Sequence, residues 1–470
     1  MLTYDLITKQ GLDNTMKKTT KILTLLALCV SVTLGLVSCG GDNGKDEPLV
    51  PENPIDPGTD APKDKLYSPE EQKEYLDEVG REFISHIQSS EISKITDWAD
   101  SMDFIFTKSF DNKAVEERFE DCLKAITLEY VGKRTEKDGR YTIEYDTYRR
   151  IYRLSNFTGH FVMNDNHWTV SESNNLQFDF KDGKGKSCVL KLEASGNKGT
   201  VYVTKDYSYD FDWSDNLYIN EEQTYIQIPE KVVMTLTQDG TELIKVIVNT
   251  DLSGLRDEHI DLMQTNLNIN TEVTIQNFYF KFDRIKYEAN NAASVSFVMY
   301  HNGKAILSAA AGCNFSLVGN GYFEEYDHLD LDLDGLDAKN VQINLNILGK
   351  VQVKGNITEA YKFGALLAKA DSHSDDDSFM SYLSQAEALM DLGVYYNGGK
   401  EPQAVFGFEA HKKSSYYYSY WEAIPVLRFT DGTSYGTFES FFNEYDFRQL
   451  ITSVEYLMKG YEKEADRLNF

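Results

Sequence analysis

The chain has 470 residues, of which 75 are Asp or Glu and 47 are Lys or Arg, and its formal charge is −28 at pH 7. Its 41% hydrophobic and 13% aromatic content can build substantial cores, so the chain is not expected to be disordered throughout. The acidity argues against a nucleic-acid partner and against polybasic attachment to anionic lipid, because both need a basic face. The length allows roughly two to four domains.

The first pattern along the chain is a targeting segment. Lys17, Lys18 and Lys21 form a positive region, and a mostly apolar run over residues 22–37 follows it. That run is shorter than the roughly 20 residues that span a membrane, but it is typical of a signal-peptide core. Residues 1–15 have no place in such a signal, so Met16 is the expected true start.

The apolar run ends in Leu36-Val37-Ser38-Cys39-Gly40, which resembles a bacterial lipobox. The resemblance implies that residues 1–38 are removed as a signal peptide and that Cys39 is lipidated. In that family the thiol receives a diacylglycerol and the new amino terminus is acylated, and two or more chains give stable membrane anchoring. The alternative is a short transmembrane anchor followed by a chance cysteine.

Acidic and proline-rich residues follow the lipobox. Residues 40–47 (GGDNGKDE) look like the acidic export signal of Bacteroidetes lipoproteins, which implies a place on the outer membrane at the cell surface. A flexible acidic tether facing the periplasm is the alternative. Five of the nine prolines lie in residues 48–65, so we expect residues 39–66 to be an extended spacer.

Residues 67–135 are predicted to be helical. Ser68-Pro69-Glu70-Glu71 supplies an N-cap, a proline at the first helical position and a capping-box glutamate. Apolar residues at helical spacing follow, and a second amphipathic pattern runs from Val115 to Ile126. The two helices are expected to form a hairpin or a lid.

Residues 136–357 are predicted to form an antiparallel β domain. Residues 341–354 alternate between apolar and polar side chains, which predicts one long strand with a bend or bulge at Gly349. Three hairpins are predicted at Asp182-Gly183, Asp239-Gly240 and Asn302-Gly303, because these pairs are strong turn signals between alternating strands.

Helical spacing returns in residues 358–470. Helices are predicted over residues 361–370, 379–392 and 438–461, and a short β-rich insert over residues 404–429. The predicted fold class is therefore α+β, with a large antiparallel β-sheet of hairpins flanked by N-terminal and C-terminal amphipathic helices.

One segment resembles the opening of an EF-hand or dockerin-like calcium loop. Asp330, Asp332 and Asp334 take positions 1, 3 and 5, and Gly335 takes position 6. The resemblance implies a calcium site, with no other cofactor expected. Position 12 is Val341, where the family needs a carboxylate, so an ordinary half-buried strand or turn is the preferred interpretation.

Two aromatic segments are candidates for ligand binding. Tyr207, Tyr209, Phe211 and Trp213 alternate with polar residues, so on a strand they share one face. A core role is the preferred interpretation, and an exposed platform for sugar rings is the alternative. The second segment is rich in tyrosine, a residue suited to recognition, and its candidates are Tyr416, Tyr418 and Trp421.

The sequence favours a lipid-anchored, non-catalytic binding protein of the cell envelope, for a glycan or an envelope protein. The support is the anchor, the aromatic content and the lack of a recognisable catalytic motif. One alternative is a lipid or lipoprotein carrier, in which a curved sheet closes an apolar cavity. The other is a hydrolase that depends on two or three convergent carboxylates.

Overall fold

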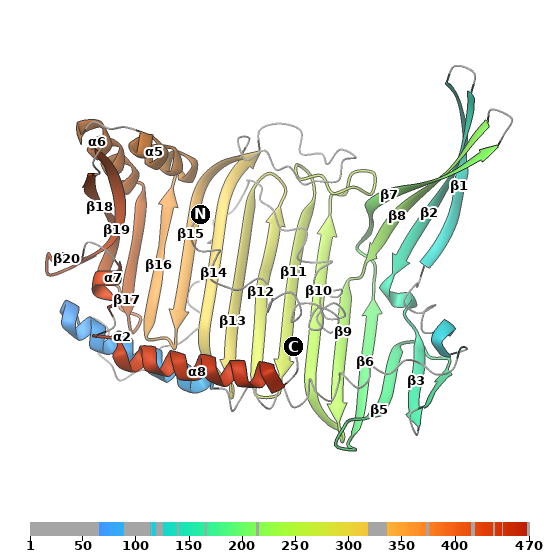
Figure 1. Cartoon of the computed structure of the whole chain (residues 1–470), viewed down its shortest axis with the longest axis horizontal. Helices are drawn as coiled ribbons and strands as arrows, with labels where there is room; N and C mark the ends of the chain where they lie inside the picture. Colours follow the sequence, from blue (N-terminus) through green and yellow to red (C-terminus); the bar gives the residue numbers. More distant parts are fainter. Residues whose placement is uncertain are drawn as a thin grey trace. The chain divides into compact units, whose positions relative to one another are not determined.

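The computed structural model describes residues 65–88, 113, 115–118, 126–138, 141–164, 167–212, 216–317, 336–372, 376–414, 419–435, 438–443 and 445–467. These residues belong to two units. The first unit contains residues 65–88, 277–317 and 336–467, and the second contains residues 113–276. Strands dominate both units and the helices are few (Figure 1), so the α+β fold class is confirmed.

The strands of the first unit are neighbours in chain order, from β12 to β20, and every pair between them is antiparallel. This is the meander of hairpins that the turn signals predict. The strands are β12 (Phe278–Glu288), β13 (Ala292–His301), β14 (Lys304–Leu317), β15 (Leu336–Ile347), β16 (Val351–Thr358), β17 (Met390–Tyr396), β18 (Ala404–Ser414), β19 (Ser419–Phe429) and β20 (Ser434–Tyr435).

The prediction of one strand over residues 341–354 is wrong. The segment is a hairpin, because Leu348 and Gly349 adopt positive φ values of 57° and 73° and reverse the chain between β15 and β16. The Gly349 amide donates to Asn346 Oδ1 at 2.8 Å, which fixes the turn. Odd-numbered positions are apolar both before the turn, up to Ile347, and after it, from Val351, so the pattern alone looks like a single strand.

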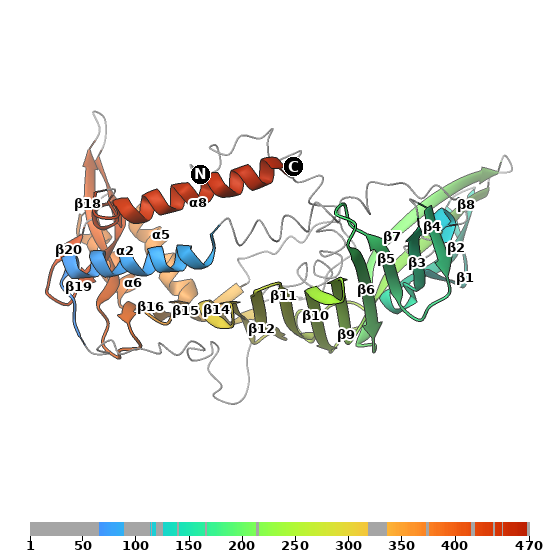
Figure 2. The same cartoon turned by 90° about the horizontal axis from the view of Figure 1, so that it is seen from below.

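The helices of the first unit lie on one face of its strands (Figure 2). They are α2 (Pro69–His86), α5 (Ala360–Ser372), α6 (Asp376–Glu387), α7 (Phe438–Phe441) and α8 (Arg448–Arg467). The capping box at Ser68 and Glu71 is confirmed. The helix predicted over residues 379–392 ends at Glu387, since β17 begins at Met390, and the predicted final helix is divided into α7 and α8.

The core of the first unit lies between α2, α7 and the strands β16–β19. Val79 of α2 and Phe441 of α7 are buried with Val351, Tyr396 and Phe429 of the sheet. A smaller cluster packs α5 and α6 against β18 and β19. Helix α2 therefore finds its apolar partners on strands that lie far away in the sequence.

The second unit holds two sheets. Seven strands follow the order β11-β10-β9-β6-β5-β3-β4, and four follow the order β1-β2-β8-β7. The pairs β3–β5 and β2–β8 are parallel, so the sheets are mixed rather than wholly antiparallel. The strands are β1 (Ile126–Asp138), β2 (Tyr141–Arg153), β3 (Gly159–Asn164), β4 (His167–Ser171), β5 (Leu176–Lys181), β6 (Ser187–Ser195), β7 (Gly199–Asp212), β8 (Asn216–Ile228), β9 (Lys231–Gln238), β10 (Thr241–Ser253) and β11 (Asn266–Ile275), with the 3-10 turn η1 (Leu154–Asn156) between β2 and β3.

The three predicted hairpin turns are confirmed. Asp239 and Gly240 have φ values of 50° and 79°, and Asn302 and Gly303 have values of 51° and 77°, as two-residue hairpin loops require. At the third turn, Asp182 Oδ1 accepts hydrogen bonds from two backbone amides of the loop. By contrast, the prediction of helix is wrong for residues 126–135, because they lie in β1, which occupies residues 126–138.

Candidate functional site

One face of the four-stranded sheet β1-β2-β8-β7 gathers tyrosines and charged side chains. The register sets Tyr209 opposite Ile219, Ile219 beside Tyr145, and Tyr145 opposite Arg134. Directly paired residues project to the same side of a sheet, so this row crosses all four strands on one face. We call that face the tyrosine face. Its polar and aromatic residues include Arg134, Tyr145, Lys205, Tyr207, Tyr209, Glu221 and Gln223.

The two tyrosines of β7 are open to solvent. Tyr207 is 44% exposed and Tyr209 is 66% exposed. Their rings are stacked, with centroids 6.4 Å apart and planes inclined by 28°. Alternation along β7 brings both rings to the same side, which gives a short aromatic platform along the strand. The prediction that these two side chains belong to the core is therefore wrong.

A buried carboxylate lies next to this platform. Glu221 is opposite Tyr207 in the register and is only 4% exposed. Its Oε1 accepts a hydrogen bond from Gln223 Nε2 at 2.8 Å and lies 3.7 Å from Lys205 Nζ. Its Oε2 lies 3.7 Å from Arg134 Nη2 and has no hydrogen-bond partner among the residues that the structure describes. A buried carboxylate needs compensating charge, which the two cations supply.

The same cations contact the aromatic rings. Lys205 Nζ lies 5.2 Å from the centre of the Tyr207 ring, and the Arg134 guanidinium lies 4.1 Å from the centre of the Tyr145 ring. Cations at these distances are attracted by the negative face of a ring. Glu221 therefore holds the donors of Lys205 and Arg134 beside the tyrosines.

A chain of hydrogen bonds fixes Glu221 from one side. The Tyr225 hydroxyl donates to Gln223 Oε1 at 3.0 Å, and the amide of Gln223 donates to Glu221. Tyr225 is buried, and burial raises the pKa of its hydroxyl, so this group stays protonated and remains a donor. The Arg149 guanidinium covers the Tyr225 ring at 4.2 Å and pairs with Glu258. These contacts hold the polar groups of the face in place.

Of the other residues predicted to bind a ligand, Trp421 alone is described, and it belongs to the first unit. Trp421 lies on β19 of the first unit, where it is partly buried and stacks on Phe379 with centroids 5.7 Å apart. Trp213, Tyr416 and Tyr418 lie outside the described residues, as do the side chain of Phe211, Cys39 and the calcium candidates Asp330, Asp332 and Asp334.

Sequence reasoning missed Arg134, Tyr145, Lys205 and Glu221. Each lies on a strand with a tyrosine within six residues, but proximity along the chain does not fix a face. The decisive fact is the parallel register of β2 with β8, which brings together residues about 75 positions apart in the sequence. A short-range pattern carries no signal for such a pairing.

Within the described ranges, no group of three or more His, Cys, Asp or Glu side chains is arranged to hold a metal ion. Among the same residues, no helix has the length and apolar composition needed to cross a membrane. Comparison of the chain with protein-family models, with curated proteins and with solved structures gives no match.

Proposed function

We propose that the protein is a lipid-anchored, non-catalytic binding protein of the cell envelope that recognises glycans through the tyrosine face. The observation that supports this function is the exposure of Tyr207 and Tyr209 as a stacked pair beside fixed polar groups. Large aromatic side chains grouped on a surface mark interaction sites, because their burial against a partner is favourable.

The chemistry of the face suits a sugar. The apolar faces of sugar rings pack on aromatic rings, while sugar hydroxyls exchange hydrogen bonds with polar groups at the rim. Arg134 and Lys205 supply donors here, and the tyrosine hydroxyls supply both donors and acceptors. Because Glu221 offsets part of the positive charge, the face does not require an anionic partner.

The anchor is the second part of the proposal. It rests on the lipobox at Cys39 and on the acidic residues that follow it, which favour the outer membrane at the cell surface over its periplasmic side. Cys39→Ala should leave the protein soluble or unprocessed. Metabolic labelling with a fatty acid should mark the wild type and not this variant, and a labelled variant would overturn the anchor.

The glycan proposal is tested with the mature protein on a glycan array, followed by titration of the best oligosaccharide. Tyr207→Ala combined with Tyr209→Ala should abolish binding while leaving the melting temperature nearly unchanged, since exposed substitutions stay within about 0.5 kcal/mol. Leu128→Ala is the control, because Leu128 is 53% exposed on the opposite face of the same sheet. Equal binding by the double variant and the control would contradict the proposal.

A second function, that of a lipid carrier, is favoured by one observation in the first unit. On the face that carries the helices, Val295, Ile343 and Leu345 remain 38–41% exposed, although Val351 and Val394 on the same face are buried. This strip would suit an acyl chain. Ile343→Lys should then weaken the binding of a fluorescent fatty acid, whereas Met380→Lys on the surface of α6 should not.

A further inference from the structure

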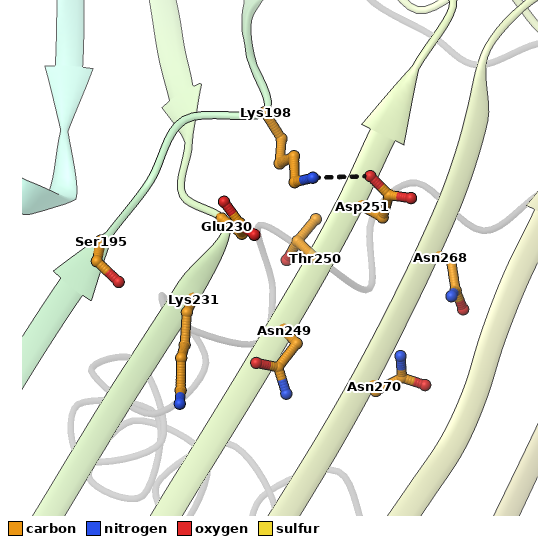
Figure 3. A pocket seen from close by; sticks show the side chains of 9 residues that line it. All are labelled: Ser195, Lys198, Glu230, Lys231, Asn249, Thr250, Asp251, Asn268 and Asn270. Carbon is orange, nitrogen blue, oxygen red and sulfur yellow. Dashed lines mark ion pairs between the residues drawn. The ribbon is translucent and has the colours of Figure 1, made fainter.

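The second unit contains a polar hollow that lies apart from the tyrosine face. It has a volume of about 480 Å³ and lies where β6, β9, β10 and β11 meet the connection between β6 and β7 (Figure 3). Its lining contains no aromatic or aliphatic residue, and it is formed by Ser195, Lys198, Glu230, Lys231, Asn249, Thr250, Asp251, Asn268 and Asn270.

The wall of the hollow is set by backbone contacts. Gly196 has a φ of 73°, and a Cβ at this position would come within 2.4 Å of Glu230 Cβ, so the close approach of Glu230 requires a glycine. The Lys198 amide donates to the Ile228 carbonyl at 2.8 Å, and the Thr250 amide donates to the Glu230 carbonyl at 2.8 Å. The connection between β6 and β7 is therefore tied to the ends of the neighbouring strands.

The floor of the hollow is a lattice of amides on adjacent strands. Asn249 is opposite Asn270 in the β10–β11 register and opposite Lys231 in the β9–β10 register, and Asp251 is opposite Asn268. The close-up shows the three asparagine side chains on the two neighbouring strands (Figure 3). Within the part of the chain that the structure describes, none of the three side-chain amides has a hydrogen-bond partner.

The charges of the hollow balance. Lys198 Nζ lies 3.1 Å from Asp251 Oδ1, and this hydrogen bond, aided by the charges of Asp251 and Glu230, raises the pKa of Lys198. Two ammonium groups, Lys198 and Lys231, therefore face two carboxylates, Glu230 and Asp251. The two carboxylates would repel a phosphate, and the two ammonium groups would repel a divalent cation. The lining therefore favours an uncharged ligand.

We propose that this hollow binds a neutral oligosaccharide by hydrogen bonds to the hydroxyl groups of the sugar. A primary amide offers two donors and an acceptor with two lone pairs, so each asparagine can both donate to and accept from adjacent hydroxyls. Strands lie about 4.8 Å apart, so the row from Ser195 across Lys231 and Asn249 to Asn270 spans roughly 14 Å. That length exceeds one sugar ring, and the site therefore takes at least a disaccharide.

This site is independent of the tyrosine face. β7 begins at Gly199, next to Lys198, and reaches Tyr207 eight residues later, which corresponds to roughly 27 Å along an extended strand. The two surfaces therefore lie near opposite ends of β7. The hollow can bind its ligand whether or not the tyrosines bind theirs.

The test is an array of neutral oligosaccharides of two to six sugars, followed by calorimetric titration of the full mature protein with the best binder. Asn249→Ala and Asn270→Ala should each weaken binding about three- to tenfold, as the loss of one or two hydrogen bonds predicts, and the double variant should weaken it further. Asn266→Ala is the matched control, because Asn266 lies on β11 on the same face as Asn270 and does not line the hollow.

The outcomes are distinct for the two sites. Binding that survives Tyr207→Ala with Tyr209→Ala but falls with the asparagine variants supports the hollow, even if the tyrosine face binds nothing. Binding lost only in the tyrosine variant would overturn the hollow, as would the absence of any neutral binder. Preferential binding of inorganic phosphate or of Ca²⁺ would overturn the ligand class. Circular dichroism melts of Asn249→Ala and Asn270→Ala must overlay the wild type, since both side chains are only partly buried.

Discussion

Tyrosines gather in both units, but with opposite exposure. In the first unit Tyr67, Tyr75 and Tyr396 pack together, with ring centroids 4.9–5.5 Å apart, and Tyr396 is 1% exposed. In the second unit Tyr207 and Tyr209 stack on each other and remain open. Tyr396 on β17 thus belongs to a core, whereas Tyr207 and Tyr209 on β7 form a surface.

The difference comes from what covers the strand. Helix α2 supplies Tyr75 and Gln72 to the buried cluster, and Tyr396 donates its hydroxyl to Gln72 Oε1 at 3.1 Å. The Tyr75 hydroxyl donates to Asn397 Oδ1 at 2.7 Å, so both polar tips are paired. Helix α2 thus covers this part of β17, although the two elements lie more than 300 residues apart in the sequence.

The largest expected effect is a difference in the free energy of unfolding between variants of the buried and the exposed tyrosines. Tyr396→Ala should lower the free energy of unfolding by about 3–5 kcal/mol, because it removes a fully buried ring and leaves a cavity. Tyr209→Ala should change it by no more than about 0.5 kcal/mol. Urea denaturation of the two variants checks this, and a similar loss in both would contradict the assigned exposures.

The next effect concerns the polar centre of the buried cluster. Gln72 is 1% exposed, donates to the carbonyls of Tyr67 and Gln403, and accepts from Tyr396. Gln72→Leu leaves these buried groups unpaired, so we expect a loss of about 1–3 kcal/mol in the free energy of unfolding. Gln385→Leu on the exposed side of α6 should be nearly neutral. An unchanged free energy of unfolding in Gln72→Leu would contradict the claim that the hydrogen bonds of Gln72 stabilise the fold.

The smallest effect is a pH dependence in the first unit. Asn277 and Asn302 donate their amides to His301 Nε2, so His301 carries its proton on Nδ1 and donates it to His86 Nδ1 at 3.1 Å. Burial lowers the pKa of His86 below its usual 6.5, and the charge of Lys304 and the neighbouring His301 lower it further.

The sign of the dependence follows from that lowered pKa. As the pH falls through about 6.5, the unfolded chain takes up a proton at His86 before the folded chain does, so the free energy of unfolding decreases. Urea midpoints at pH 7.5 and pH 5.5 should therefore differ more for the wild type than for His86→Gln. An identical difference in both proteins would contradict the lowered pKa of His86.

Much of the fold could be predicted from local patterns. The cap at Ser68, the turns at Asp239-Gly240 and Asn302-Gly303, and the helix over residues 361–370 each follow from chemistry within a few residues. The hairpin at Leu348-Gly349 could not, since a leucine with positive φ is an unusual turn residue and the apolar positions keep the same phase on both sides of the turn. The parallel pairs also escaped prediction, because register between distant strands leaves no local signal.

The candidate sites were predicted only in part. Tyr207 and Tyr209 stand out in the sequence, but their exposure depends on which elements cover β7. The hollow was not predicted at all, because Lys198, Asn249 and Asn270 come from three separate segments and meet only through the order β6-β9-β10-β11. Neither lipidation at Cys39 nor calcium at Asp330 is tested by the described residues, and both stay predictions.

The most direct test of the account is chemical footprinting of the tyrosines. Limited nitration with tetranitromethane, mapped by mass spectrometry, should modify Tyr207 and Tyr209 and spare Tyr396 in the folded protein. Repeating the reaction with the best oligosaccharide from the array should protect Tyr207 and Tyr209, because the sugar covers their rings. Unmodified Tyr207 and Tyr209 in the free protein, or modification that the oligosaccharide leaves unchanged, would contradict the claim that the tyrosine face is an open glycan-binding surface.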